Sequence, residues 1–403
     1  MDKLSDQDEG HMERSEFLRM SAILGIGMPF LGSCGSSKST PILKPNEKVL
    51  IIGAGAAGMS AAYLLKKKGV DVTVLEASST YGGRIESLKG FTDFTIPLGA
   101  EWLHTTEPVL ERIVADPTVK IDIQTTSYDF EVDYCLDAES GEKMKCGDMG
   151  LSESDLRFTN SSWIDFYETY ILPSIKESIQ YHQVVKTIDY SKDLISIKTD
   201  KGEFTADRVI LTVPVTILKE GDISFVPALP KKKQEAIAEL DMYEGFKCFI
   251  AFKEQFYPPF VNVQDEGKGP TRAYFDAAYA KNSKDNILGL VAVGPYARPY
   301  LDLPESERIA FILKELDDIF DGQATPNYLK HTLKNWSDDP FAKGTYYAKF
   351  SIGTYSAVKA MSQPVEDKLF FAGDLYTDGN GWSMVHVAAE SARKAVERLV
   401  GQI

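Results

Sequence analysis

One segment constrains the fold of this chain more than any other, "VLIIGAGAAGMSAAYLLKKKGVDVTVLEAS" at residues 49–78. Its first residues form an apolar, β-branched run, which is typical of a strand buried on both faces. A GxGxxG pattern follows, then an apolar segment that predicts a helix ending at Gly69. The run "VDVTVLEA" predicts a second strand. This order predicts a β-α-β unit of the dinucleotide-binding Rossmann type.

The glycines and the acid of this unit each have a physical role. Gly53 permits a tight turn, Gly55 lets the backbone approach a pyrophosphate, and Gly58 lets the helix pack closely on the strand. Glu76 ends the second strand, where a carboxylate can accept the hydroxyls of an adenosine ribose. Because a carboxylate disfavours a 2′-phosphate, FAD or NAD is expected. The neighbouring backbone positions expected to contact the same ligand are Ala56, Ala57 and Ala77.

A second glycine pair decides between these cofactors. In "STYGGRIES", Gly83 is followed by Arg84, whose guanidinium can place a planar, permanently charged fork on the pyrophosphate. The combination of GxGxxG, the acid and GGR resembles the flavin-containing amine oxidase superfamily, which includes monoamine oxidases, polyamine oxidases, histone-lysine demethylases and L-amino acid oxidases. The resemblance implies FAD and an α/β fold of the glutathione-reductase type.

Later segments carry the same resemblance through residues 46–403. "IPLGAEWLH" is similar to the family's segment along the flavin ring, and "LFFAGDLYTDGNGWSMVHVAAES" is similar to its C-terminal flavin segment. Between them, "VVKTIDYSKDLISIKTDKGEFTADRVILTVP" resembles a returning hairpin and strand. The flavin contacts that the resemblance implies here are Gly99, Ala100, Glu101, Trp102, Val185, Trp336, Gly373, Asp374, Met384 and Val385.

The resemblance also implies a domain organisation. The FAD-binding domain comprises residues 46–105, 181–225 and 366–403. An α+β substrate domain with a mixed sheet comprises residues 106–180 and 226–365.

The resemblance assigns the chemistry to a lysine and an aromatic cage. It implies that Lys219 holds a water against the reactive flavin nitrogen as a buried ammonium, and that Tyr346 forms one wall of the cage. The other wall is Trp382 or, in a shifted alignment, Met384. Thr345 stands where covalently flavinylated relatives have a cysteine, which implies non-covalent FAD.

Two histidines are further candidates. His104 matches a histidine near the substrate of polyamine oxidases, with either a structural or a catalytic role. His386 is expected to cap or pack rather than to transfer protons. Trp336 is expected to support the flavin from behind. No Cys/His cluster has metal-ligand spacing, so no metal is expected.

The expected activity is oxidation of an amine to an imine, hydrolysis of the imine to an aldehyde, and reoxidation of the flavin by O2 to give H2O2. One alternative is an L-amino acid oxidase, with Arg272 or Arg298 as the cation for the substrate carboxylate. Others are a desaturase of a hydrophobic substrate and a flavin-binding module without turnover. The net charge of -15 argues against a nucleic-acid partner.

Residues 1–45 resemble an export signal followed by a tether. "MERSEFLRMSAILGIGMPFLGSC" has basic residues, a short apolar stretch and a lipobox-like ending at Cys34. This pattern predicts a bacterial lipoprotein of the periplasm or cell envelope, attached to a membrane through lipidated Cys34. The alternative is an amphipathic helix packed on a cytoplasmic protein.

The remaining cysteines are few. Cys135 and Cys146 flank a predicted turn at Ser140-Gly141 and could pair in an oxidising compartment, although two reduced thiols fit the sequence equally well. Cys248 lies in an apolar strand and is expected in the core.

Overall fold

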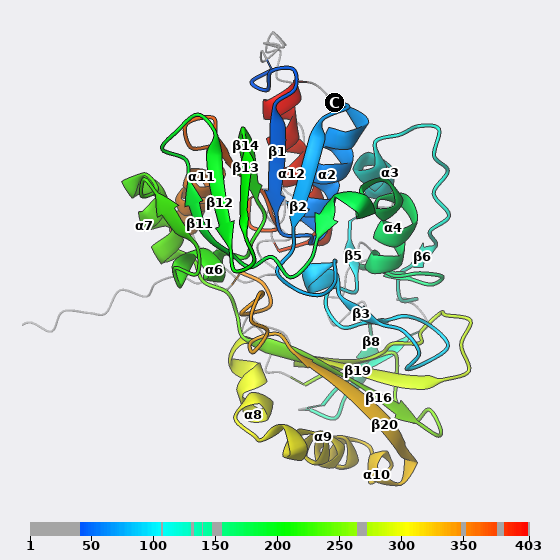
Figure 1. Ribbon diagram of the computed structural model, residues 1–403. Coiled ribbons are helices and arrows are strands. Elements are labelled where there is room, and N and C mark those ends of the chain that lie inside the picture. Colours follow the sequence, from blue (N-terminus) through cyan, green and yellow to red (C-terminus); the bar gives the residue numbers. More distant parts are fainter. Residues whose placement is uncertain are drawn as a thin grey trace, which may run out of the picture.

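The computed structural model describes residues 41–105, 108–129, 133–138, 140–146, 155–263, 272–347, 352–376 and 383–401. The predicted export signal with Cys34, and the predicted cage residue Trp382, lie outside these ranges. Figure 1 shows an upper part built around β1 and β2 and a lower part built around β16, β19 and β20. The fold class expected from the sequence, a mixed α/β protein with a Rossmann-type domain, is confirmed.

A five-stranded parallel sheet lies at the centre of the upper part. Its strands, in spatial order, are β10 (Ile179–Gln180), β2 (Asp71–Leu75), β1 (Lys48–Ile52), β14 (Arg208–Leu211) and β21 (Leu369–Phe371). β1 is central, and its apolar residues are buried on both faces, as their sequence requires. The carboxyl ends of the parallel strands therefore meet at one edge, where ligands of such sheets bind.

Helices cover one face of this sheet. α2 (Ala56–Lys67) packs against α12 (Val385–Val400), so the first and last helices of the described chain are neighbours (Figure 1). The same apolar core includes α3 (Pro108–Val114), α4 (Trp163–Tyr170) and α5 (Leu172–Ile175).

A second sheet covers the other face. Its strands, in order, are β13 (Glu203–Ala206), β12 (Ile195–Thr199), β11 (Val185–Asp189) and β15 (Ser224–Val226). β11 and β12 form the antiparallel hairpin expected from the sequence. The helices that pack with this sheet are α6 (Val215–Lys219), α7 (Lys231–Glu239) and α11 (Ile352–Met361).

The lower part contains a seven-stranded mixed sheet. In order, its strands are β20 (Tyr328–Asn335), β16 (Gly245–Phe252), β19 (Asn286–Val293), β18 (Arg272–Asp276), β17 (Phe260–Asn262), β7 (Tyr134–Asp137) and β8 (Lys143–Lys145). α9 (Glu305–Ile319), with the short α8 (Arg298–Leu301) and α10 (Ala324–Asn327), packs on one face. All eight residues of β16 are buried, and this strand lies between β20 and β19.

Short strands connect the two parts. β3 (Ser87–Leu88) pairs with β4 (Ile96–Pro97). β9 (Asp155–Phe158) pairs with both β5 (Leu103–His104) and β6 (Thr125–Thr126). The segment between β4 and β5 therefore runs between the parallel sheet and the mixed sheet.

Cys135 and Cys146 form a disulfide that closes the β7–β8 hairpin. Gly141 takes a positive φ of 71° in the turn between them, which glycine adopts without strain. Of the two alternatives left open by the sequence, a disulfide or two reduced thiols, the disulfide is therefore correct. Cys248 is buried with a free thiol, as expected.

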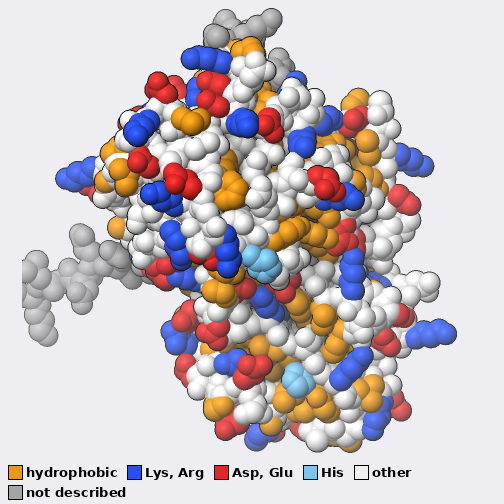
Figure 2. All heavy atoms as spheres, in the orientation of Figure 1, with side chains coloured by type: hydrophobic (Ala, Val, Ile, Leu, Met, Phe, Trp, Pro, Cys, Tyr) orange, Lys and Arg blue, Asp and Glu red, His pale blue; other side chains and the backbone are white. Residues whose placement is uncertain are grey.

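The surface carries both signs of charge. Figure 2 shows acidic and basic side chains interspersed over the face in view, although the whole chain has a net charge of -15. Among the described residues, no helix is long and apolar enough to span a membrane.

Candidate functional site

The glycine turn lies at the carboxyl edge of the parallel sheet. After β1 the chain turns at Gly53, whose φ of 101° lies in the region that favours glycine. A Cβ on Gly58 would lie 1.9 Å from the Gly53 carbonyl oxygen, so no other residue fits at the start of this helix. Gly55 is the N-cap of α2, and no side chain caps the helix there. The first N–H groups of α2 are thus available to an anionic ligand.

Glu76 lies beside this turn, as predicted. It is buried at the end of β2, and its two oxygens accept hydrogen bonds from the backbone N–H groups of Ala54 at 2.7 Å and Ser78 at 2.8 Å. Each carboxylate oxygen keeps a second lone pair. Glu76 can therefore still accept hydrogen bonds from the hydroxyls of a ribose.

Arg84 joins three segments that are distant in sequence. Its Nη2 is 2.6 Å from Oδ1 of Asp374, and its Nη1 is 3.0 Å from Oδ2 of Asp374 and 2.6 Å from the carbonyl oxygen of Thr345. The guanidinium thus uses three of its five N–H donors on the protein, and two remain for a ligand. Asp374 lies three residues after the end of β21, so this ion pair also lies at the carboxyl edge of the sheet.

The segment Gly99–Trp102 runs close to Arg84 and Trp336. The N–H of Ala100 donates to the carbonyl oxygen of Arg84 at 2.9 Å, and a Cβ on Gly99 would lie 1.9 Å from that oxygen. The buried ring of Trp336 donates from Nε1 to the carbonyl oxygen of Leu98 at 2.9 Å. Trp336 therefore supports this segment, in keeping with the structural role expected for it.

The prediction that Lys219 is a buried ammonium is wrong. Lys219 is the last residue of α6, and its side chain is 32% exposed. Its Nζ lies 3.0 Å from a carboxylate oxygen of Asp241 and 3.1 Å from the carbonyl oxygen of Leu240. This is a partly exposed ion pair on the protein and not a buried ammonium.

Lys247, on β16, is the buried lysine beside the predicted flavin segment. Its Nζ lies 2.7 Å from Oε2 of Glu101, 3.0 Å from the carbonyl oxygen of Gly99 and 3.2 Å from that of Pro97. Burial lowers the pKa of Lys247, and the Glu101 carboxylate counteracts part of this effect. The sequence held one signal for it, because Lys247 is the only charged residue of the wholly buried strand GFKCFIAF.

Arg157, on β9, is the second cation at Glu101. Its Nη2 lies 3.3 Å from Oε1 of Glu101, and its Nη1 donates to the hydroxyl of Tyr128 at 2.6 Å. The Arg157 side chain is only 2% exposed. The sequence offered no motif in the region of Arg157, so this residue was not predicted.

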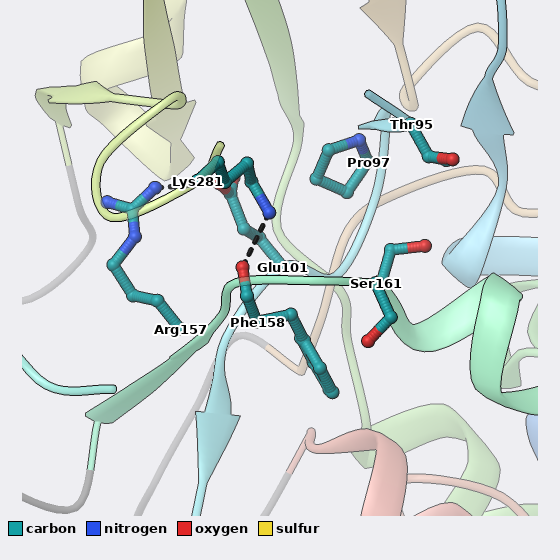
Figure 3. A pocket seen from close by; sticks show the side chains of 8 residues that line it. Thr95, Pro97, Glu101, Arg157, Phe158, Ser161 and Lys281 are labelled. Carbon is teal, nitrogen blue, oxygen red and sulfur yellow. Dashed lines mark hydrogen bonds and ion pairs between the residues drawn. The ribbon is translucent and has the colours of Figure 1, made fainter. Parts of the chain in front are cut away.

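A pocket opens beside Glu101 and Arg157, and Figure 3 shows the side chains around it. Lys281 donates from Nζ to the carbonyl oxygen of Phe158 at 2.5 Å, and burial lowers the pKa of Lys281 to about 8. The Oγ atom of Ser161 is buried, and none of the residues that the structure describes forms a hydrogen bond with it. The lining residues are Thr95, Pro97, Glu101, Arg157, Phe158, Ser161, Ser162 and Lys281.

Tyr346 packs against a second tyrosine. Its ring is perpendicular to that of Tyr243, with 6.0 Å between the ring centroids. Backbone hydrogen bonds of 2.8 Å join Tyr243 to Tyr346 and to Thr345, so the two segments are held together. Met384 is the N-cap of α12, and Trp382 lies outside the described residues. Tyr243 is thus an aromatic neighbour of Tyr346 that the sequence did not indicate.

The two histidines have different surroundings. Nδ1 of His104 lies 2.6 Å from Oδ1 of Asp155, between the paired strands β5 and β9. His386 lies in the first turn of α12, and its buried Nδ1 has no hydrogen-bond partner among the described residues. Burial lowers the pKa of His386 to about 4, with further lowering by nearby His104 and Arg112. His386 is therefore neutral at pH 7.

Neither arginine proposed for a substrate carboxylate is uncommitted. Arg272 forms an ion pair with Glu315 and donates to the hydroxyl of Tyr300 at 2.7 Å. Arg298 forms a 2.6 Å ion pair with Glu244. Each guanidinium already holds a carboxylate of the protein.

The residues present fit a flavin dinucleotide. Within the described part of the chain, no side chain caps the start of α2 or α12, and Nδ1 of His386 in the first turn of α12 has no hydrogen-bond partner. Uncapped helix N-termini favour anionic groups. Glu76 and Arg84 offer a ribose acceptor and free donors at the same edge. Among the residues that the structure describes, no group of His, Cys, Asp and Glu could hold a metal ion.

Comparisons with known proteins agree with this geometry. A family model described as "Flavin containing amine oxidoreductase" matches residues 167–400. A model described as "NAD(P)-binding Rossmann-like domain" matches residues 51–117.

Individual relatives include both histone demethylases and amine oxidases. The chain is 25% identical over 421 residues to Lysine-specific histone demethylase 2 of Homo sapiens, covering 82% of this chain and 50% of that protein. It is 23% identical over 432 residues to Polyamine oxidase 4 of Oryza sativa subsp. japonica, covering 87% of this chain and 88% of that protein. The chain spans about half the length of this human demethylase and of Lysine-specific histone demethylase 1B of Mus musculus.

Solved structures share the fold. Wild-type Putrescine Oxidase bound to putrescine superposes with a TM-score of 0.70 at 15% sequence identity, covering 88% of this chain and 99% of that one.

Proposed function

Because this chain belongs to the flavin-containing amine oxidoreductases, whose model matches residues 167–400, we propose that it is an FAD-dependent amine oxidase. Bound FAD would supply the hydride acceptor for an amine substrate and pass the electron pair to O2. The substrate leaves as an imine, which water hydrolyses to an aldehyde, and O2 leaves as H2O2. The chain itself must bind the amine, hold the cofactor and place a charge beside it.

The observation that carries this proposal is the buried ammonium of Lys247 at the Gly99–Trp102 segment. The family resemblance assigns a lysine that holds a water beside the flavin and assists reoxidation by O2. Lys247 meets the requirement of burial, whereas Lys219 does not. A fixed positive charge in a buried site stabilises negative charge that develops during reaction. We therefore assign this role to Lys247.

Tyr346 and Tyr243 are the proposed aromatic surface for the substrate amine. An aromatic face attracts a cation through its quadrupole and contacts alkyl carbons by packing. The two rings are perpendicular, with 6.0 Å between their centroids, and we assign them jointly to the substrate amine. Neutral His386 adds no positive charge that would repel an amine.

We further propose that FAD is held without a covalent bond. Thr345 stands at the position where a covalent thioether would need a cysteine, and its Oγ1 hydrogen bonds to the carbonyl oxygen of Tyr243 at 2.9 Å. The contacts available to the cofactor are then those of Glu76, Arg84, the glycine turn and the start of α12.

The L-amino acid oxidase alternative is not favoured. It needs a cation for the substrate carboxylate, and Arg272 and Arg298 both hold protein carboxylates instead. Nothing among the described residues specifically favours a desaturase or a module without turnover.

We propose that the protein acts outside the cytoplasm as a lipoprotein attached through Cys34. The Cys135–Cys146 disulfide supports an oxidising compartment, because such bonds persist there and are rare in reducing cytosol. Fractionation of expressing bacterial cells tests this location.

The function is tested on the purified, FAD-loaded protein under anaerobic conditions. Spermidine, putrescine, benzylamine and L-amino acids are added in turn while the flavin spectrum is recorded. Bleaching by an amine and its reversal by O2 with release of H2O2 are expected. A protein that binds FAD but is bleached by none of these compounds would contradict the proposal.

The role of Lys247 is tested by stopped-flow mixing of the reduced protein with O2. Lys247→Met is expected to slow reoxidation roughly 10²-fold, because one fixed charge is removed from a buried site. Lys219→Met is the matched control and is expected to reoxidise like the wild type. If the Lys219 variant is slow and the Lys247 variant is not, our assignment is wrong.

A further inference from the structure

Three buried charged side chains form a row across the site, which we call the Lys247–Glu101–Arg157 row. Each comes from a different part of the fold: β16, the segment between β4 and β5, and β9. Oε2 of Glu101 lies 2.7 Å from Lys247, and Oε1 lies 3.3 Å from Arg157. The three side chains are 6%, 7% and 2% exposed. One carboxylate is thus shared between two cations away from water.

The row carries one net positive charge, because two cations share one carboxylate. Two further groups face it from other elements. Asp276, at the end of β18, is buried, and Lys281 lines the adjoining pocket. Unit charges a few ångströms apart interact strongly in a poorly solvated site. The charge on each member therefore affects the other two.

Stability alone does not account for this arrangement. Buried ion pairs often contribute no more to stability than apolar residues of similar volume. The Lys247 ammonium also contacts the carbonyl oxygens of Gly99 and Pro97, so it is tied to both the backbone and the side chain of the predicted flavin segment. The row leads from this segment to Arg157, whose positive charge acts on Lys247 as well as on Glu101.

We propose that Glu101 is a positioning residue whose carboxylate interacts with both Lys247 and Arg157. Through Glu101, Arg157 then sets how strongly the Lys247 charge stabilises the negative charge of the reduced flavin. The inference rests on the proposed function only in placing the flavin at Gly99–Trp102. Removing the Glu101 charge leaves Lys247 uncompensated and favours the reduced, more negative flavin. Removing the Arg157 charge leaves Lys247 as the only cation paired with Glu101 in the row. The carboxylate then offsets more of the Lys247 charge, which disfavours the reduced flavin. The two changes act in opposite directions.

The test is the midpoint potential of the bound flavin, measured by redox titration of the FAD-loaded protein. Glu101→Gln is expected to shift the equilibrium about tenfold toward reduced flavin, which is about +30 mV for a two-electron couple. Arg157→Met is expected to shift it by about the same factor in the opposite direction. Lys247→Met is expected to lower the potential as well, because it removes the charge that Glu101 opposes.

The control is another carboxylate paired with an arginine. Glu315 pairs with Arg272 between α9 and β18, away from the flavin segment. Glu315→Gln is expected to change thermal stability but leave the potential unchanged, as a purely structural pair would. If Arg157→Met does not fold, Glu101→Gln alone still decides the matter. A zero or negative shift in a folded, flavin-loaded Glu101→Gln protein overturns the inference.

The outcomes separate this inference from the proposed function. If the midpoint potentials shift with opposite signs but no amine bleaches the protein, the inference about the charge row is supported and the amine oxidase function is wrong. Bleaching by an amine with equal potentials in all variants would sustain the amine oxidase and defeat the charge row.

Discussion

His386 occupies a position where a positive charge is disfavoured from several directions. Its ring is largely buried, it lies in the first turn of α12, and His104 and Arg112 are close. A helix N-terminus itself carries partial positive charge. The histidine is therefore held neutral at pH 7.

This neutrality predicts a pH dependence of stability. The pKa of His386 is about 4 in the folded protein against 6.5 for the free group. Between these values the unfolded chain binds the proton and the folded chain does not, so stability falls as pH drops from 6.5 to 4 and then levels off. The free energy of unfolding lost in this way is up to about 3 kcal/mol. His386→Gln should flatten the dependence of Tm on pH in this window.

The outcome that would contradict this expectation is an unchanged slope of Tm between pH 4 and pH 6.5 in His386→Gln. Bound flavin must be kept saturating in both proteins, since loss of the cofactor at low pH would itself change Tm.

At the scale of elements, the β7–β8 hairpin is attached to the mixed sheet by few contacts. β7 pairs with the short β17, and among the described strands β8 is at the edge of the sheet and pairs only with β7. Around the disulfide, Tyr128 completes a small core of its own with Cys135 and Cys146. The covalent bond therefore takes the place of a larger apolar core in this hairpin.

Loss of this disulfide should lower stability. Cys146→Ser removes a link across 11 residues of chain, for which the chain-entropy estimate is about 3 kcal/mol. A clear fall in Tm is expected by differential scanning fluorimetry. Reductant should lower the Tm of the wild type in the same way and leave the variant unaffected. Equal effects of reductant on both proteins would show that the disulfide does not account for the difference.

At the scale of the whole molecule, the site joins distant parts of the chain. Arg84, Thr345 and Asp374 meet at the edge of the parallel sheet, while Lys247 reaches Glu101 from the mixed sheet. A cofactor bound along this line would contact segments from both parts. Its binding energy then adds to the stability of the folded molecule.

Non-covalent FAD should therefore be both removable and stabilising. Acid precipitation is expected to release all of the yellow colour into the supernatant. Adding FAD back to gently prepared apoprotein should raise Tm, by an amount equivalent to about 2.7 kcal/mol at a hundredfold excess over Kd. Colour that remains with the precipitated chain would instead indicate a covalent bond. NAD is the control ligand and is expected to leave Tm unchanged.

Much of this architecture could be predicted from local patterns. The strand–turn–helix–strand unit and the acid at its end lie where their sequences placed them. The Lys219 environment could not be predicted in this way. The sequence does not show which of two lysines is buried, one that follows an apolar helix or one inside an apolar strand. This becomes clear only when the strand is known to have neighbours on both sides. Burial of β16 by strands on both sides made the difference.

The sequence by itself determined those features whose physical cause is local. Gly58 is required because a side chain there would collide with a carbonyl only five residues earlier, and Glu76 ends its strand beside the same turn. Only the tertiary structure decided which charges meet. Glu101 and Lys247 are 146 residues apart, and their partnership depends on how two sheets face each other. Such a pairing leaves no periodic or spacing signal in one chain, because it is selected by packing and desolvation in the folded molecule.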